Sequence, residues 1–178
     1  DGGVGGGSGA RRRGVSTARP SLVSRFDRRV DDAFCVLRGR RLPDRVLYSL
    51  SEVGDFSLVW HIARAAIAAT GDDRAERRAL RLSAGLIAES ILVNGVIKSI
   101  SRRARPASHE ARPHRLRQPR TSSFPSGHAS AAACAAVLLS DGARPAEVVA
   151  WWTLAALVAA SRVHVRIHHP SDVVGGAL

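Results

Sequence analysis

The sequence predicts an all-α fold, a bundle of helices, and three observations lead to this prediction. Four mostly apolar segments are each long enough to form a helix, at 56–70, 82–100, 127–139 and 146–160. Within 24–38, apolar residues recur at helical spacing between charged ones, at Phe26, Val30, Phe34 and Leu37. No stretch alternates apolar and polar residues in the way that is typical of a strand.

The two parts of the chain differ in composition. Residues 1–20 are basic and rich in glycine and hold no long apolar run, so we expect a disordered leader and not a signal peptide. Residues 21–178 hold the apolar segments and are predicted to form one domain. A last helix is expected to begin at Pro170, close to the end of the sequence, so we expect the domain to be truncated at its C-terminal end.

The predicted helices follow one another in a definite order. After the amphipathic helix within 24–38 and the apolar helix 56–70, the charged segment 74–81 is expected to connect to helix 82–100. The segment 102–120 holds seven arginines and three prolines, and because proline interrupts a helix we expect a loop there. Three further helices are each expected to begin at a proline, which suits the first turn of a helix, at 125–140, 145–163 and from Pro170 onward.

Charge and hydropathy leave two kinds of protein open. The formal net charge of +12 favours an anionic partner, such as a polyanion, an anionic membrane surface or a phosphorylated substrate. No segment reaches the roughly 18 uncharged apolar residues of a clear transmembrane helix. The apolar segments therefore fit either a soluble helical bundle or an integral membrane protein with short spans. The two cysteines, Cys35 and Cys134, lie far apart and do not indicate a disulfide framework.

The first cluster of chemically useful residues is Lys98 with Arg105 and Pro106. Lys98 is the only lysine among 27 lysines and arginines. A compact ammonium and a planar guanidinium are not interchangeable in a tight site, so a single lysine at a helix end indicates a specific contact with an anion. A lysine that merely extends its ammonium from a helix end into water is the alternative.

The second cluster is Pro125-Ser126-Gly127-His128. A serine can cap the following helix and Pro125 can occupy its first turn, which leaves the next amides unpaired at the positive end of the helix dipole. Gly127 has no side chain to keep an anion away, so the sequence predicts a phosphate-binding site at this helix N-terminus. The alternative is a well-capped helix with a chance histidine.

The third cluster contains Arg162, His168 and Asp172. Arg162 is expected at the end of one helix and Asp172 in the first turn of the next, where helix dipoles favour these charges. The Asp172 carboxylate can accept a hydrogen bond from one ring nitrogen of His168 and leave the other nitrogen free to attack. Ordinary helix-end charges and a loop histidine are the alternative. His164 is the rival nucleophile, and we expect a structural role for it.

Together the three clusters resemble the signature motifs of the type 2 phosphatidic acid phosphatase (PAP2) superfamily, as Lys98-x6-Arg105-Pro106, Pro125-Ser126-Gly127-His128 and Ser161-Arg162-x5-His168-x3-Asp172. The resemblance extends from about residue 24 to the end and points to the membrane lipid phosphatases of actinobacteria. It implies an enzyme that hydrolyses a lipid phosphate monoester or diphosphate, of the phosphatidate or polyprenyl-phosphate type. It also implies that neither a metal nor another cofactor is needed.

The resemblance further implies a role for each residue. His168 would attack phosphorus and form a phosphohistidine, and Asp172 would orient its ring. His128 would protonate the leaving alkoxide and then activate water. The phosphate oxygens would be bound by the remaining residues of the motifs, namely Lys98, Arg105, Ser126, Gly127 and Arg162.

Such a protein would be integral to the cell membrane, with its active site facing outside the cytoplasm, and some relatives continue into a diacylglycerol kinase domain. A vanadium-dependent haloperoxidase shares the motifs, but those enzymes are larger and soluble. A basic nucleic-acid-binding protein without catalysis would explain the charge but not Lys98, His168 and Asp172. Because the arginine-rich segment 102–120 holds no aromatic residue for stacking on bases, we expect no nucleic-acid partner.

Overall fold

The computed structural model describes residues 19–69, 71, 73–107 and 121–178. All regular structure in these ranges is helical, which confirms the predicted all-α fold. The elements are α1 (Leu22–Cys35), α2 (Arg41–Val53), the 3-10 helix η1 (Asp55–Ser57), α3 (Leu58–Ala68), α4 (Asp73–Ser90), the π-helical segment η2 (Ile91–Ile97), α5 (Lys98–Ile100), α6 (Gly127–Ser140), α7 (Pro145–His164) and α8 (Pro170–Ala177). Most of the predicted leader 1–20, and residues 108–120 of the predicted loop, lie outside the described residues.

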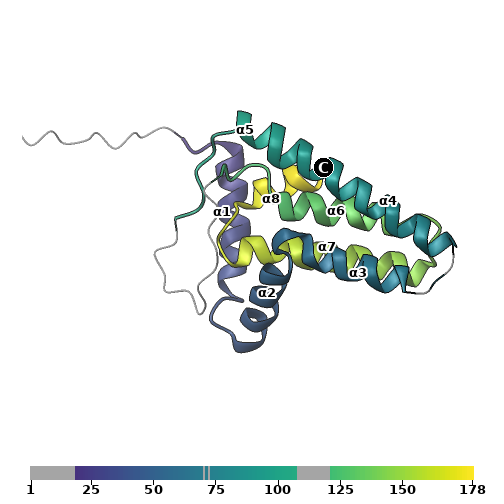
Figure 1. Ribbon diagram of the computed structural model, residues 1–178. Coiled ribbons are helices and arrows are strands. Elements are labelled where there is room, and N and C mark those ends of the chain that lie inside the picture. Colours follow the sequence, from purple (N-terminus) through teal and green to yellow (C-terminus); the bar gives the residue numbers. More distant parts are fainter. Residues whose placement is uncertain (1–18, 70, 72, 108–120) are drawn as a thin grey trace, which may run out of the picture.

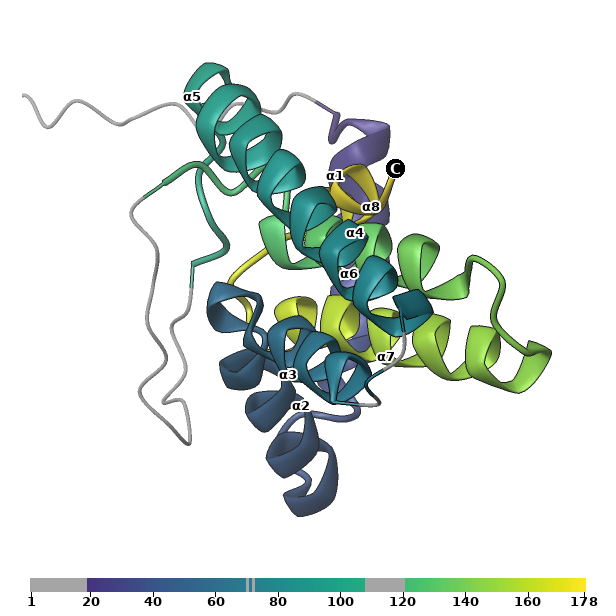
Figure 2. The ribbon, with the colours of Figure 1, turned by 45° about the vertical axis from the view of Figure 1, so that its right-hand side comes forward.

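Helix α6 is the centre of the bundle. It packs against α4, α7 and α8, and Figures 1 and 2 show it between α4 and α7, with α1 across one end of the bundle. Its buried face consists of small residues such as Ala132, Ala135 and Ala136. Alanine favours a helix and lets neighbouring helices approach closely. The larger side chains of the core, including Trp60 and Leu82, come from the surrounding helices.

Three predicted details of the helices are wrong. The charged segment 74–81 is not a connector but the first half of α4, because Ala75, Ala79 and Leu82 recur at helical spacing and are buried. The sequence also gave no expectation of α2, which buries Leu47 and other residues against α7. Helix α6 begins after Pro125, because the Ser126 hydroxyl accepts a hydrogen bond from the N–H of Ala129 at 3.4 Å and caps the helix.

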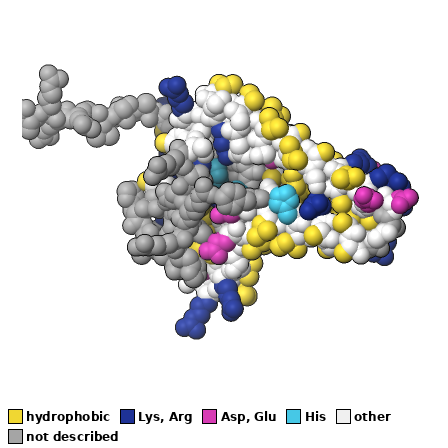
Figure 3. Space-filling view, in the orientation of Figure 1, with side chains coloured by type: hydrophobic (Ala, Val, Ile, Leu, Met, Phe, Trp, Pro, Cys, Tyr) yellow, Lys and Arg dark blue, Asp and Glu magenta, His cyan; other side chains and the backbone are white. Residues whose placement is uncertain are grey.

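Two long apolar helices favour a membrane protein over a soluble bundle. The continuous helix Asp73–Ile100 has a mean hydropathy of 1.5 in its most apolar window, of which only 17% is buried, and 28% of the corresponding window of Pro145–His164 is buried. The core helix of a soluble protein would be mostly buried. Here large apolar side chains such as Ile87, Ile91 and Val149 are exposed, and Figure 3 shows apolar side chains along α3 and α4.

Helix α1 is fastened to the bundle by polar contacts. The Arg38 guanidinium, just beyond α1, donates hydrogen bonds to the carbonyl oxygens of Val163 and His164 at the end of α7, both at 3.0 Å. Asp27 of the same helix is buried against the start of α8. Both cysteines are free thiols, as the sequence predicts.

Candidate active site

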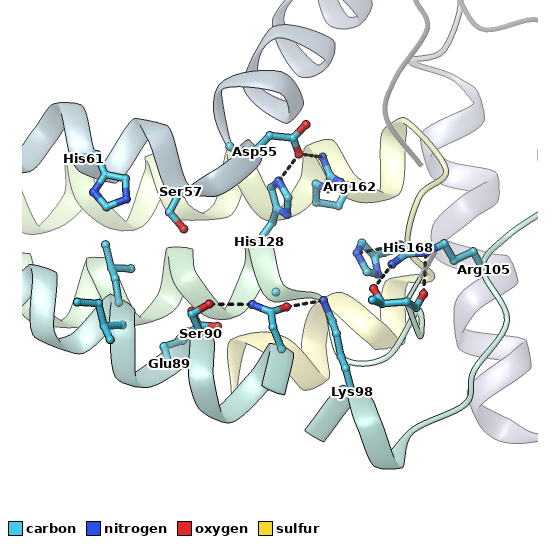
Figure 4. A pocket seen from close by; sticks show the side chains of 16 residues that line it. Asp55, Ser57, His61, Glu89, Ser90, Lys98, Arg105, His128, Arg162 and His168 are labelled. Carbon is cyan, nitrogen blue, oxygen red and sulfur yellow. Dashed lines mark hydrogen bonds and ion pairs between the residues drawn. The ribbon is translucent and has the colours of Figure 1, made fainter. Parts of the chain in front are cut away.

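The three sequence clusters meet at one cavity of about 450 Å³. Figure 4 shows it between α3 and the α4–α5 helix, with the start of α6 and the end of α7 behind it. Six of the predicted site residues line it, namely Lys98, Arg105, Gly127, His128, Arg162 and His168. The other two, Asp172 and Ser126, are fully buried behind the cavity wall.

His168 is held with one ring nitrogen toward the cavity. Its Nε2 lies 3.3 Å from Nη1 of Arg105, and its Nδ1 lies 3.8 Å from Oδ2 of Asp172. Because a guanidinium can only donate, Nε2 must be the accepting nitrogen and Nδ1 carries the proton toward Asp172. Burial is the main reason that the pKa of His168 falls to about 4, so the ring is neutral at neutral pH. A neutral ring keeps one unprotonated nitrogen, here Nε2, that can act as a nucleophile.

Asp172 remains ionised although it is fully buried. Burial by itself would raise its pKa, but hydrogen bonds and the Arg103 charge lower the pKa to about 2. The donors to its carboxylate are the Ser123 hydroxyl at 2.5 Å, the His169 N–H at 2.8 Å and the Arg103 guanidinium at 2.6 Å. These contacts fix the carboxylate that faces His168.

Arg103 is a site residue that the sequence did not reveal. Its guanidinium donates to Asp172 and to Asp27 of α1, both at 2.6 Å, and to the Ser171 hydroxyl at 2.7 Å. Asp27 in turn accepts a hydrogen bond from the N–H of Ser171 at 2.8 Å. Nothing in the sequence distinguishes Arg103 from its neighbours in the arginine-rich segment. The structure shows that it ties α1 to the start of α8, directly behind His168.

We expect Arg103→Ala to destabilise the protein, because the buried Asp172 and Asp27 carboxylates would lose their shared cation. Removing one partner of a buried ion pair costs on the order of 3 kcal/mol. The measurement is thermal unfolding in detergent micelles, with the exposed neighbour Arg102→Ala as the matched control. Equal unfolding temperatures of the two variants would contradict the role assigned to Arg103.

Lys98 is held close to the start of α6. Its ammonium donates to Asn94 Oδ1 at 2.8 Å, and the Asn94 amide donates to the Ser90 hydroxyl at 3.3 Å. A methyl group on Gly127 would lie only 2.8 Å from Asn94 Oδ1 and 3.2 Å from Lys98 Nζ. The glycine of the second motif therefore leaves room for the lysine of the first.

Two guanidiniums, the buried one of Arg162 and the half-buried one of Arg105, complete with Lys98 the positive wall of the cavity. Arg162 is 1% exposed and donates to the Ser51 carbonyl oxygen at 3.1 Å and to the Ser51 hydroxyl. Arg105 donates to the carbonyl oxygens of Ile167 at 3.0 Å and Ser122 at 3.2 Å. Each of these partners is a neutral carbonyl or hydroxyl oxygen. The positive charge of both arginines therefore remains available to an anion in the cavity.

The Ser126 amide, which the sequence predicts to be unpaired and to bind phosphate, is not unpaired. Its N–H donates to the carbonyl oxygen of Asp172 at 2.9 Å and is therefore already engaged. This contact is possible because α8 packs directly on the Ser126 backbone, where a methyl group on Gly176 would lie 2.4 Å from the Ser126 carbonyl oxygen. The amides of Gly127 and His128 remain at the helix N-terminus, where no earlier carbonyl of α6 can accept from them.

Asp55 is the second site residue that the sequence did not reveal. Its Oδ1 lies 3.0 Å from Nε2 of His128 and 3.9 Å from Nη1 of Arg162. The backbone approaches this histidine closely, because a methyl group on Gly54 would lie 2.9 Å from the ring. If Nε2–H donates to Asp55, Nδ1 is the nitrogen of His128 that remains for a substrate.

His164 has the structural role predicted for it. It does not line the cavity, is 2% exposed, and its Nε2 lies 2.8 Å from Oδ1 of Asp44 on α2. Its ring meets Phe34 and Tyr48 edge to face. Within the described parts of the chain, no three acidic, histidine or cysteine side chains gather in a way that could hold a metal ion.

Comparisons with known proteins agree with this geometry. Residues 78–178 match the family model described as the PAP2 superfamily. The chain belongs to the PAP2 superfamily. Among curated PAP2 relatives, the decaprenylphosphoryl-5-phosphoribose phosphatase of Mycolicibacterium smegmatis is 38% identical over 129 residues, which cover 72% of this chain and 68% of the relative. The protein of the same name from Mycobacterium tuberculosis is 36% identical, with 71% and 68% covered.

Solved structures show the same PAP2 fold. The transmembrane PAP2-type phosphatidylglycerolphosphate phosphatase of Bacillus subtilis aligns with a TM-score of 0.64 and 24% identity, over 89% of this chain and 81% of that chain. Aquifex aeolicus LpxE aligns with a TM-score of 0.70 and 22% identity, over 89% of both chains. The predictions of a PAP2 fold and of a phosphatase are confirmed. The comparisons favour this class over the haloperoxidase and nucleic-acid-binding alternatives.

Proposed function

We propose that this PAP2 phosphatase hydrolyses a lipid phosphate through a phosphohistidine on His168, without a metal ion. The observation that carries the proposal is a neutral, buried His168 whose Nε2 lies 3.3 Å from Nη1 of Arg105, in a cavity that Lys98 and Arg162 also line. The mycobacterial relatives are named for a polyprenyl-linked sugar phosphate, which favours a polyprenyl-type substrate over phosphatidate.

In the first step, Nε2 of His168 attacks phosphorus and the bond between phosphorus and the alcohol oxygen breaks. Asp172 stabilises the positive charge that forms on the ring, since it faces the Nδ1–H. Lys98, Arg105 and Arg162 neutralise the charge on the phosphoryl oxygens. This positive wall supplies the charge stabilisation that Mg²⁺ provides in other phosphatases.

His128 moves the protons. It protonates the leaving alkoxide from Nδ1 while Asp55 stabilises the charged ring through Nε2. The neutral His128 then takes a proton from the water that attacks the phosphohistidine. Breakage of the bond between His168 and phosphorus releases inorganic phosphate and restores both histidines to their starting states.

The site lies at the membrane interface in this proposal. Lys98 and Arg162 stand near the C-terminal ends of the two candidate spans, and these ends meet at the cavity. We place this end outside the cytoplasm, with the arginines at the start of α4 on the cytoplasmic side. The arginine-rich segment 102–120 opposes a simple count of positive charges, and we assign it to the attraction of anionic headgroups.

We expect the purified full chain in detergent to release phosphate from lipid phosphates in the presence of EDTA and to be blocked by vanadate. The reason is that the anion site is built from Lys98, Arg105, Arg162 and backbone amides. The measurement is phosphate release from phosphatidate, phosphatidylglycerophosphate, a polyprenyl diphosphate and a polyprenyl-phosphoribose phosphate. A strict requirement for added Mg²⁺ would exclude this mechanism, and no release from any of the lipids would exclude the proposed function.

A further inference from the structure

The cavity extends well beyond its positive wall. Its volume of about 450 Å³ lies within the range of about 300–1,000 Å³ that is typical of small-molecule sites. In the view of Figure 4, Arg105 and His168 lie at one end. Ser57 and His61 lie at the other end, opposite Glu89 and Ser90 of α4. We call these four residues the polar end of the cavity.

Glu89 is the residue of the polar end with an unmet hydrogen-bonding capacity. Its carboxyl group lies near the Ser130 hydroxyl, but one of its oxygens, Oε1, is buried without a hydrogen-bond partner among the described residues. A carboxyl oxygen can accept a hydrogen bond, and buried acceptors in proteins are nearly always paired. A ligand that fills the cavity and carries hydroxyl groups would supply the missing donor.

The geometry of phosphoryl transfer places the leaving alcohol in this polar end. The attacking and leaving atoms lie on opposite sides of phosphorus, and His168 attacks from the opposite end of the cavity. His128, which protonates the leaving oxygen in the proposed mechanism, lies between His168 and the polar end in Figure 4. The alcohol is therefore directed toward Glu89.

We propose that the polar end binds the alcohol part of the substrate and that Glu89 accepts a hydrogen bond from one of its free hydroxyl groups. The inference rests on the proposed function. It favours a lipid-linked sugar or polyol phosphate. Leu86 and Ile87, which shortly precede Glu89 on α4, also line the cavity and can contact the carbon atoms between the hydroxyls.

The same carboxylate disfavours the other lipid classes. Phosphatidate leaves as a diacylglycerol, which has no free hydroxyl to pair with Glu89 until its bond to phosphorus breaks. A polyprenyl diphosphate leaves as a polyprenyl phosphate, whose negative charge would be repelled by the carboxylate. A phosphorylated pentose carries free hydroxyls next to the ester, and phosphatidylglycerophosphate carries one on its glycerol.

The test compares Glu89→Ala and Glu89→Gln with Glu76→Ala, which removes an exposed glutamate from the same helix. The substrates are a polyprenyl-phosphoribose phosphate, phosphatidylglycerophosphate, phosphatidate and nitrophenyl phosphate. Loss of a hydrogen bond to a charged group should lower kcat/KM about 10- to 100-fold for a hydroxyl-bearing lipid. Phosphatidate and nitrophenyl phosphate should change about threefold or less, and Glu89→Gln should show an intermediate loss.

A selective loss with either hydroxyl-bearing lipid supports the proposal and identifies which alcohol binds. An equal loss on all four substrates would overturn it, because Glu89 would then act through the nearby Lys98 charge or through the helix. No loss on any substrate would overturn it as well. Failure of the proposed function is distinct, since the unmodified protein would then release no phosphate from any lipid.

Discussion

His168→Ala is expected to be inactive on every substrate, with turnover at background level. The variant lacks the nitrogen that forms the bond to phosphorus, so no phosphoenzyme can accumulate. His164 does not replace it, because its ring is buried against Asp44 outside the cavity. The loss of activity in His168→Ala should therefore be the same for every leaving group.

The His128→Ala variant should differ in this respect. An alkoxide that leaves from a lipid phosphate needs a proton, and losing that proton should slow the reaction by about 100- to 10,000-fold. A nitrophenolate leaves without a proton, so His128→Ala should still form the phosphoenzyme from nitrophenyl phosphate. The intermediate should then persist, because His128 also activates the water that hydrolyses it.

The measurement is a rapid burst of nitrophenol, together with phosphate trapped on the protein, in each single variant. We expect a burst with His128→Ala and none with His168→Ala. The reverse result would exchange the two assigned roles. A burst from both variants would mean that neither histidine is the nucleophile.

Lys98→Arg is the second large effect that we expect, although the substitution keeps the charge. The ammonium lies where a methyl group on Gly127 would be only 3.2 Å away, so a wider, planar guanidinium cannot enter without moving the α6 backbone or the phosphate. A displacement of about 1 Å in a reacting group can cost roughly 100-fold in rate.

The measurement for Lys98→Arg is kcat on a lipid phosphate, with thermal unfolding to verify that the variant is folded. The matched control is the opposite exchange at an exposed position, Arg102→Lys, which should keep its activity. Turnover of Lys98→Arg close to that of the unmodified protein would mean that Lys98 only extends from a helix end into water.

The parts of the site that the sequence predicted depend on short spacings. His168 and Asp172 are four residues apart across one helix start, and Lys98 stands at the end of one long apolar helix, so these spacings made them candidates. The resemblance to the PAP2 motifs then selected them over the structural alternatives. Asp55 and Arg103 were missed because their partners lie far away in sequence. Nothing near Asp55 indicates that it meets His128, and nothing near Arg103 indicates Asp27.

The same limit explains the errors. The rules for helix capping predicted an unpaired Ser126 amide. They consider only neighbouring residues and not the carbonyl of Asp172, which α8 brings to this amide. The fold class was predictable because apolar periodicity is a local property. Helix α2 was missed because its buried face, with Leu47 and Ser51, is defined only by its contact with α7.

The packing of α8 on α6 has a consequence for the order of events during synthesis. Lys98 and Arg105 precede His168 along the chain and are therefore synthesised before it. His168 takes its position only when α8 meets the backbone of Ser126, where Gly176 leaves room for it. A nascent chain is thus unable to cleave a phosphate ester until α8 has packed on α6.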